Sequence, residues 1–169
     1  FGMSVAKGFR QLKREWADIM GGGAGNISEF LNNVAMVIME HCGGASGPIW
    51  GSAFRAASFA AKGKETLSLA GFAELFQAAV AGIYKTGERS FGRGAVVGDK
   101  TLIDALAPCA DSLTQSGKDG ERLLPAMLKA AEAAVSGAEQ TKNIVARMGR
   151  AGTVGERSLG YPDAGAHAL

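Results

Sequence analysis

The sequence has 169 residues, of which 47% are hydrophobic, and it is long enough for one domain with a sizeable core. Its 18 basic and 16 acidic residues give a net charge of +2 without a basic stripe, so nucleic acid is not an expected partner. The longest apolar run, Val34 to Met39, is far too short to cross a bilayer, and no membrane association is expected. The two cysteines, Cys42 and Cys109, match neither a disulfide framework nor a metal-ligand spacing, which favours a cytoplasmic location.

Apolar residues recur at helical spacing along nearly the whole chain, and no segment alternates apolar and polar residues as a strand does. The pattern predicts an all-α helical bundle, and the absence of repeats or linkers predicts a single domain over 1–169. Pro108 lies inside an expected helix, where it predicts a kink. In chain order, the expected helices are Met3 to Ile19, Ile27 to His41, Pro48 to Lys62, Ser68 to Lys85, Thr101 to Gln115 and Leu124 to Met148.

A glycine-rich turn, GGASG at 43–47, separates the second and third of these helices. Pro48 suits a first helical turn, and Ser46 is placed to cap it. The free N–H groups of a helix start, beside glycines that admit close approach, can bind an anion such as phosphate. Because such turns are also common as plain connectors, this turn alone leaves both interpretations open.

Two further segments are polar and rich in glycine. VVGDKTLIDAL at 97–107 contains Asp99 as a candidate N-cap, and GRAGTVGERSLGYPDAGAHAL at 149–169 has too much glycine for a plain helix. Three such segments in one apolar bundle indicate that one end binds a ligand. The alternative is that each segment is a solvated connector.

These segments also carry a resemblance to a known family. GGASGPIWG (43–51), GDKTLIDALAP (98–108) and ARMGRAGTVGERSLGYPDAGA (146–166), in this order and separation, resemble the L subunit or L domain of dihydroxyacetone kinases. The resemblance spans nearly the whole chain. It implies a barrel of eight antiparallel helices that holds ATP or ADP with Mg²⁺ at one end and transfers a phosphoryl group to a short ketose.

The resemblance also implies which residues meet the nucleotide. Ala45 and Ser46 would contact phosphate, Gly87 and Leu102 would border the adenine pocket, and Arg150 would meet the nucleotide directly. The full expected set is Gly44, Ala45, Ser46, Gly87, Leu102, Arg150, Asp163 and Gly165. Arg150 has an alternative role in a salt bridge to Asp163 or Glu156, and Trp50 either packs in the core or flanks the nucleotide.

The chain departs from the family pattern near its start and after Gly87. The family's magnesium-binding aspartates would lie before Phe1, so no metal ligand is expected within the chain, the terminal helices are expected to be incomplete, and the chain alone is expected to be inactive. Phe1 and Ser4 stand where histidine and asparagine are common in the family. The segment ERSFGRGAVV at 88–97 is longer than in typical bacterial members, and we expect a flexible insertion there.

Two classes of function remain open at this point. The first is a phosphotransfer component that works with a dihydroxyacetone kinase K subunit or domain, with ATP, or ADP rephosphorylated by a phosphocarrier protein, as the source of phosphate. The second is a non-catalytic nucleotide-binding or interaction module of the same fold. A homodimer is compatible with either class.

Overall fold

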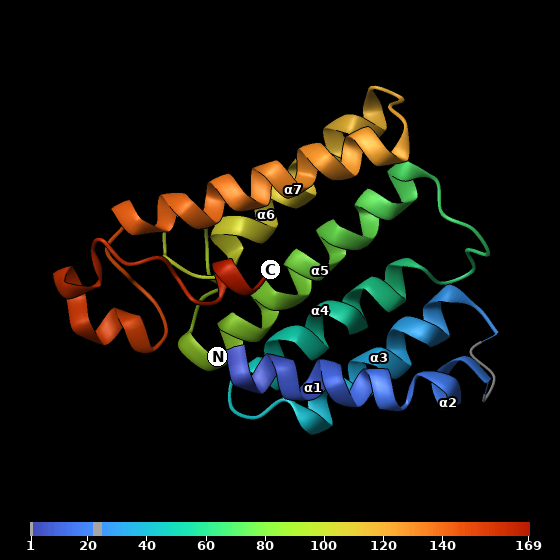
Figure 1. The fold of residues 1–169 in the computed structure, drawn as a ribbon, viewed down its shortest axis with the longest axis horizontal. Coiled ribbons are helices and arrows are strands. Elements are labelled where there is room, and N and C mark those ends of the chain that lie inside the picture. The colour runs from blue at the N-terminus through green and yellow to red at the C-terminus, as the bar shows by residue number, and fades with distance from the viewer. Residues whose placement is uncertain (1, 22–24) are drawn as a thin grey trace.

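The computed structural model describes residues 2–21 and 25–169, and these residues form helices and no strands (Figure 1). The all-α prediction is therefore confirmed, whereas the expectation for Phe1 concerns a position outside the described residues. Within the described part, no helix combines the length and apolarity that a membrane span needs. The elements are α1 (Gly2–Arg14), α2 (Trp16–Gly21), α3 (Ile27–His41), α4 (Ser46–Ala60), α5 (Leu69–Phe91), α6 (Ile103–Lys118), α7 (Leu123–Gln140) and the 3₁₀ segments η1 (Thr141–Asn143), η2 (Arg150–Ser158) and η3 (Ala166–Ala168).

Successive helices from α3 to α7 run antiparallel, and each contacts the next, while α1 packs against α3 (Figure 1). This up-and-down order gathers the connections on two ends of the bundle. The connections at 42–45 and 92–102 and the segment 141–169 lie at one end, together with the start of α1 (Figure 1). We call this end the loop end, and all three glycine-rich motifs of the sequence lie there.

The core between the helices combines branched apolar side chains with glycines at close crossings. Ile38, Ile103 and Leu113 are fully buried. At Gly137 in α7, a Cβ would lie only 2.0 Å from the carbonyl oxygen of Asp104 in α6. In a regular helix the N–H of residue 108 would donate to the same Asp104 carbonyl, but proline has no N–H. The helix α6 nevertheless continues through Pro108. The kink expected at Pro108 stays a prediction.

The last long helix ends earlier than its apolar stripe predicts. The stripe extends to Met148, but α7 ends at Gln140 and a 3₁₀ turn follows. The Thr141 hydroxyl donates to the carbonyl of Ala138 (2.6 Å) and accepts the N–H of Asp163 (2.8 Å). Because these bonds draw the returning chain onto the end of α7, the helix cannot continue along its axis.

Two other boundaries differ from the sequence-based expectation. The first expected helix divides into α1 and α2 at Glu15. The fourth extends beyond Lys85 to Phe91 and ends at Gly92, whose φ of 74° is the left-handed conformation of a helix C-terminus. The first four residues of the 88–97 segment therefore belong to a helix and not to a flexible insertion.

The crossing of α6 and α7 yields a prediction about stability. Gly137→Ala should lower the free energy of unfolding by about 1–3 kcal/mol, because the new methyl group would meet the Asp104 carbonyl and force the helices apart. Urea denaturation monitored by circular dichroism measures the change. Gly71→Ala in α5 is the matched control, since its Cβ would meet only ordinary contacts at 3.5 Å and alanine favours a helix. Equal stability of both variants would contradict the close crossing.

Candidate functional site

The three glycine-rich motifs contribute to one hydrophobic cluster at the loop end. Leu102 from the second motif is buried in this cluster, and Ile49 from the first and Met148 from the third pack against it. The motifs are separated by about fifty residues along the chain, but their apolar side chains meet. The three segments are therefore packed into one unit at the loop end.

The GGASG turn presents the uncapped start of α4. The helix begins at Ser46, and Ala45, the residue before it, makes no side-chain bond to the first turn. The prediction that Ser46 caps this helix is wrong, because Ser46 is already the first helical residue and is only 3% exposed. Gly44 has φ +63°, which glycine adopts without strain. The N–H groups of Ser46 and Gly47 thus have no side-chain cap, and Pro48, the third residue of the helix, has no N–H that needs one.

Contacts with α1 fix the position of this turn. The Ser4 hydroxyl donates to the carbonyl of Gly43 (2.7 Å), and Gly8 admits the sulfur of Cys42, which would lie 2.2 Å from a Cβ at that position. Gly47 is equally tight, since its Cβ would lie 2.6 Å from the carbonyl oxygen of Cys42. The Ser4 hydroxyl on α1 therefore holds the GGASG turn in place through its main chain.

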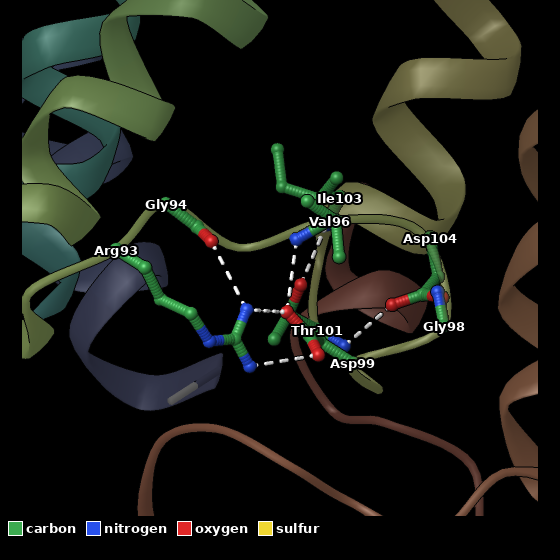
Figure 2. Close-up of polar contacts among 8 residues, drawn as sticks. All are labelled: Arg93, Gly94, Val96, Gly98, Asp99, Thr101, Ile103 and Asp104. Carbon is green, nitrogen blue, oxygen red and sulfur yellow. Dashed lines mark hydrogen bonds and ion pairs between the residues drawn. The ribbon is translucent and has the colours of Figure 1, made fainter.

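The second motif takes part in an ion pair that the sequence did not predict, between the buried carboxylate of Asp99 and the exposed side chain of Arg93, which lies just before the motif. The Arg93 guanidinium donates to both carboxylate oxygens of Asp99, at 2.5 and 2.9 Å, and the N–H of Val96 also donates to Asp99 (Figure 2). These bonds, the one from Arg93 foremost, lower the pKa of Asp99 below its usual range. The prediction of Asp99 as N-cap is wrong, since α6 starts at Ile103. The ion pair also anchors the 88–97 segment.

Asp104, in the first turn of α6, binds the loop that precedes the helix. Its two carboxylate oxygens accept the N–H groups of Gly98 (2.6 Å) and Thr101 (2.7 Å), while the Thr101 hydroxyl accepts the N–H of Ile103 (Figure 2). Sequence reasoning missed Asp104, although an acidic residue in the first helical turn is a recognised signal for this position.

Lys100 joins the second motif to the third. Its side chain is buried, and its ammonium donates to the carbonyls of Ile144 (3.1 Å) and Ser158 (2.5 Å). Its φ of +62° is uncommon for a residue other than glycine, which indicates that the surroundings impose this conformation. A main-chain bond from Arg147 to the carbonyl of Asp99 (3.0 Å) adds to the connection. Local sequence patterns did not indicate this role for Lys100.

Three of the expected nucleotide-binding residues meet at the end of the chain. A Cβ at Gly165 would lie 2.8 Å from a carboxylate oxygen of Asp163 and 3.3 Å from the Cβ of Leu102. The same Asp163 oxygen accepts the N–H of Ala166 (2.8 Å). Burial raises the pKa of Asp163, and the charge of Asp104 raises it further against the opposing effect of hydrogen bonds and Lys100. Leu102 is itself buried in the hydrophobic cluster, and Gly165 packs against it from the end of the chain.

The remaining expected residues differ in their surroundings. Gly87 lies against the loop that follows α5, where its Cβ would be 3.2 Å from the Cα of Gly94. Arg150 is exposed at the start of η2 and, among the described residues, forms no ion pair with Asp163 or Glu156. Of the two roles considered for Arg150, the salt bridge is therefore absent from the structure.

Trp50 packs in the interior. Its ring is buried and meets the ring of Phe9 edge-on, with centroids 6.3 Å apart. This arrangement accounts for Trp50 as a core residue, while its indole N–H has no hydrogen-bond partner.

The described residues do not fit a magnesium site. Across 2–21 and 25–169, no group of three or more histidine, cysteine, aspartate or glutamate side chains could hold a metal ion. Asp99 and Asp104 lie close in sequence, but their oxygens are occupied by Arg93 and by main-chain N–H groups. No chemical step is therefore assigned to a metal here.

Comparison with known proteins places this geometry in a family. The family model for the DAK2 domain matches residues 1–169. The chain belongs to the DAK2 domain family. It is 33% identical to the PEP-dependent dihydroxyacetone kinase, ADP-binding subunit DhaL, of Escherichia coli K12 over 165 residues, which covers 98% of this chain and 74% of that protein.

Other relatives of this DAK2 domain differ in size. The ADP-binding subunit DhaL of PEP-dependent dihydroxyacetone kinase 1 from Listeria innocua is 31% identical over 98% of this chain and 73% of its own length. The L-erythrulose kinase of Pectobacterium atrosepticum is 36% identical over 87% of this chain but only 23% of its own length. The domain thus occurs both in separate subunits and in much longer chains.

The Arg93–Asp99 pair predicts a pH-dependent stability. Because the pKa of Asp99 is lower in the folded protein than in the unfolded chain, its ionised form contributes stability that is fully present above about pH 4 and is lost as pH falls through the lowered value. Asp99→Asn should therefore be less stable than the parent at pH 7, and the difference should shrink at acid pH. Urea denaturation between pH 2.5 and pH 7 measures it, at about half-unit steps. Glu132→Gln, at an exposed position of α7, is the control, and a difference independent of pH would contradict the assignment.

Proposed function

We propose that this chain is the nucleotide-binding component of a kinase that phosphorylates dihydroxyacetone or a related short ketose. The observation that carries the proposal is the uncapped start of α4 at Ala45, located at the same end of the bundle as the exposed, unpaired Arg150. Two relatives that cover nearly the whole chain are named as ADP-binding subunits of dihydroxyacetone kinases, which supports the same conclusion.

The proposed binding mode places the phosphates of ADP or ATP at the GGASG turn. Gly44 allows the close approach of the phosphates, and the N–H groups at Ala45 and Ser46 and the Ser46 hydroxyl donate to them. Arg150 supplies a charged, bidentate donor to the same phosphates. Because Arg150 forms no ion pair among the described residues, no carboxylate competes with the phosphates for its charge.

The base of the nucleotide would lie between the second and third motifs. Gly87 allows the loop at 93–95 to pack closely on one side of this position, and Leu102 holds Gly165 and the Asp163 turn on the other. Since Leu102 is buried, we assign it a supporting role and assign the contact itself to the 163–165 backbone.

Phosphoryl transfer depends on positioning and charge neutralisation more than on covalent chemistry. A component that only holds the nucleotide therefore contributes by positioning one of the two reactants. The ketose would be held by a K subunit or domain. Relatives named as PEP-dependent or PTS-dependent kinases favour ADP rephosphorylated by a phosphocarrier as donor, whereas the erythrulose kinase and triokinase relatives leave ATP as the alternative. When bound, Mg²⁺ would neutralise phosphate charge, and its ligands are expected outside the described residues.

A non-catalytic nucleotide-binding module of the same fold is the second candidate. The observation that favours it is the lack of a metal-binding group among residues 2–21 and 25–169. The two candidates share the nucleotide site and differ in whether phosphate leaves it.

Nucleotide binding is tested by two substitutions. Ser46→Ala and Arg150→Ala should each weaken ADP binding by about 1–3 kcal/mol, which is about five- to 150-fold in Kd, because each removes a hydrogen bond to a charged group. Isothermal titration calorimetry with ADP and Mg²⁺ measures Kd. Arg122→Ala, which removes an exposed arginine at the start of α7 and at the other end of the bundle, is the control. Unchanged affinity in both site variants would remove the phosphate assignment.

Kinase activity separates the two candidates. We expect the 169-residue chain with a purified K component and dihydroxyacetone to give no turnover with either donor, ATP or ADP plus its phosphorylated phosphocarrier, because the described residues cannot hold Mg²⁺ on the phosphates. A version of the chain preceded by the family's aspartate motif should gain turnover if the phosphotransfer proposal is correct. Coupled detection of ketose phosphate measures both reactions. ADP binding without turnover in the aspartate version would support the non-catalytic module.

A further inference from the structure

A surface groove lies on the outside of the bundle, between α4 and α5. It has a volume of about 800 Å³ and reaches the end of α3 at Met39. None of the residues assigned above to the nucleotide lines it. We call it the α4–α5 groove, and the proposal drawn from it goes beyond the proposed function.

The lining of this groove carries positive charge only. Arg55 from α4 and Lys85 and Arg89 from α5 contribute to it, and no acidic residue does. All three cations are exposed, and among the described residues none of them forms an ion pair. Lys85 and Arg89 are one helical turn apart, where like charges repel and destabilise a helix. The groove therefore concentrates positive charge that no ion pair of the described residues neutralises.

The shape of the groove follows from one glycine. A Cβ at Gly82 in α5 would lie 2.6 Å from the carbonyl oxygen of Ser52 in α4, so the two helices approach closely there. Side chains on either side of the contact, with Arg55 on one helix and Lys85 on the other, form the walls. Because the floor is backbone and small side chains, the helix crossing sets the position of the groove, while long side chains set the height of its walls.

The length and apolar content of the groove favour a protein segment over a small anion. Between Pro48 and Phe59, both of which line it, α4 rises about 16 Å, several times the size of a phosphate group. Phe59 is 66% exposed at one end, and Met39 is 36% exposed at the other, where its side chain lies over Gly51. A ligand that matches this surface combines carboxylates along its middle with apolar side chains near its ends.

We propose that the α4–α5 groove binds an acidic amphipathic segment of a partner protein. Carboxylates of the segment pair with Arg55, Lys85 and Arg89, and its apolar side chains cover Phe59 and Met39. An amphipathic helix laid into a surface groove is a common mode of peptide recognition, and the charge complementarity sets its specificity and rate of association.

The test uses the 169-residue chain and a fluorescein-labelled synthetic helix of about four turns, with glutamates on one face and leucines on the other. Fluorescence anisotropy measures Kd for the parent, for the groove variant Arg55→Glu/Lys85→Glu/Arg89→Glu, and for a control with the same charge change on α1, Lys7→Glu/Arg10→Glu/Lys13→Glu. We expect the groove variant to bind at least about tenfold more weakly, the control to change by less than about twofold, and added salt to weaken binding to the parent.

A second readout does not depend on whether the triple variant folds. In the parent protein labelled at methionine methyl groups, the NMR signal of Met39 should shift when the peptide is added, whereas that of Met127 on α7 should not, and Phe59→Ser should weaken peptide binding. Equal Kd for the groove and control variants, or no shift at Met39, would overturn the proposal. Retention of the parent, but not the groove variant, on phosphatidylglycerol vesicles without peptide binding would overturn it in favour of an anionic lipid surface.

Discussion

The hydrogen bonds of the Lys100 ammonium hold the loop end together. Removing a cation from water is costly, and among the described residues Lys100 forms no ion pair that offsets this cost. The carbonyls of Ile144 and Ser158 provide the compensation, aided by the more distant charge of Asp163. Since the segment 141–169 contains only 3₁₀ turns, its attachment to the bundle depends on such contacts and not on a helix of its own.

The topology of the bundle explains why this attachment can build a site. In an up-and-down arrangement, alternate connections return to the same end, so the turn before α4, the loop before α6 and the chain after α7 become neighbours (Figure 1). Each then supplies something that the others lack. The first offers free helix N–H groups, the second a network of satisfied carboxylates, and the third an exposed arginine.

Periodicity in the sequence was enough to predict the fold class and the bounds of α3, because both depend on local apolar spacing and on the turns that follow. The resemblance supplied the positions of the candidate site. What neither could supply were interactions between distant segments. The apolar stripe continues past Gln140, and only the bond from Asp163 to Thr141 reveals why α7 ends there. Likewise, Asp99 reads locally as a cap, and the ion pair with Arg93 makes it a structural anchor instead.

The lack of an α-helix after Gln140 has a consequence for the resistance of this protein to proteolysis. A segment held by a few side-chain bonds opens more often than the bundle beneath it, and each opening exposes main chain to proteases. A ligand that binds only the closed arrangement reduces the open fraction in proportion to its concentration. The lifetime of the polypeptide would then follow the supply of whatever occupies the loop end, so that a metabolite could set the abundance of its own binding protein.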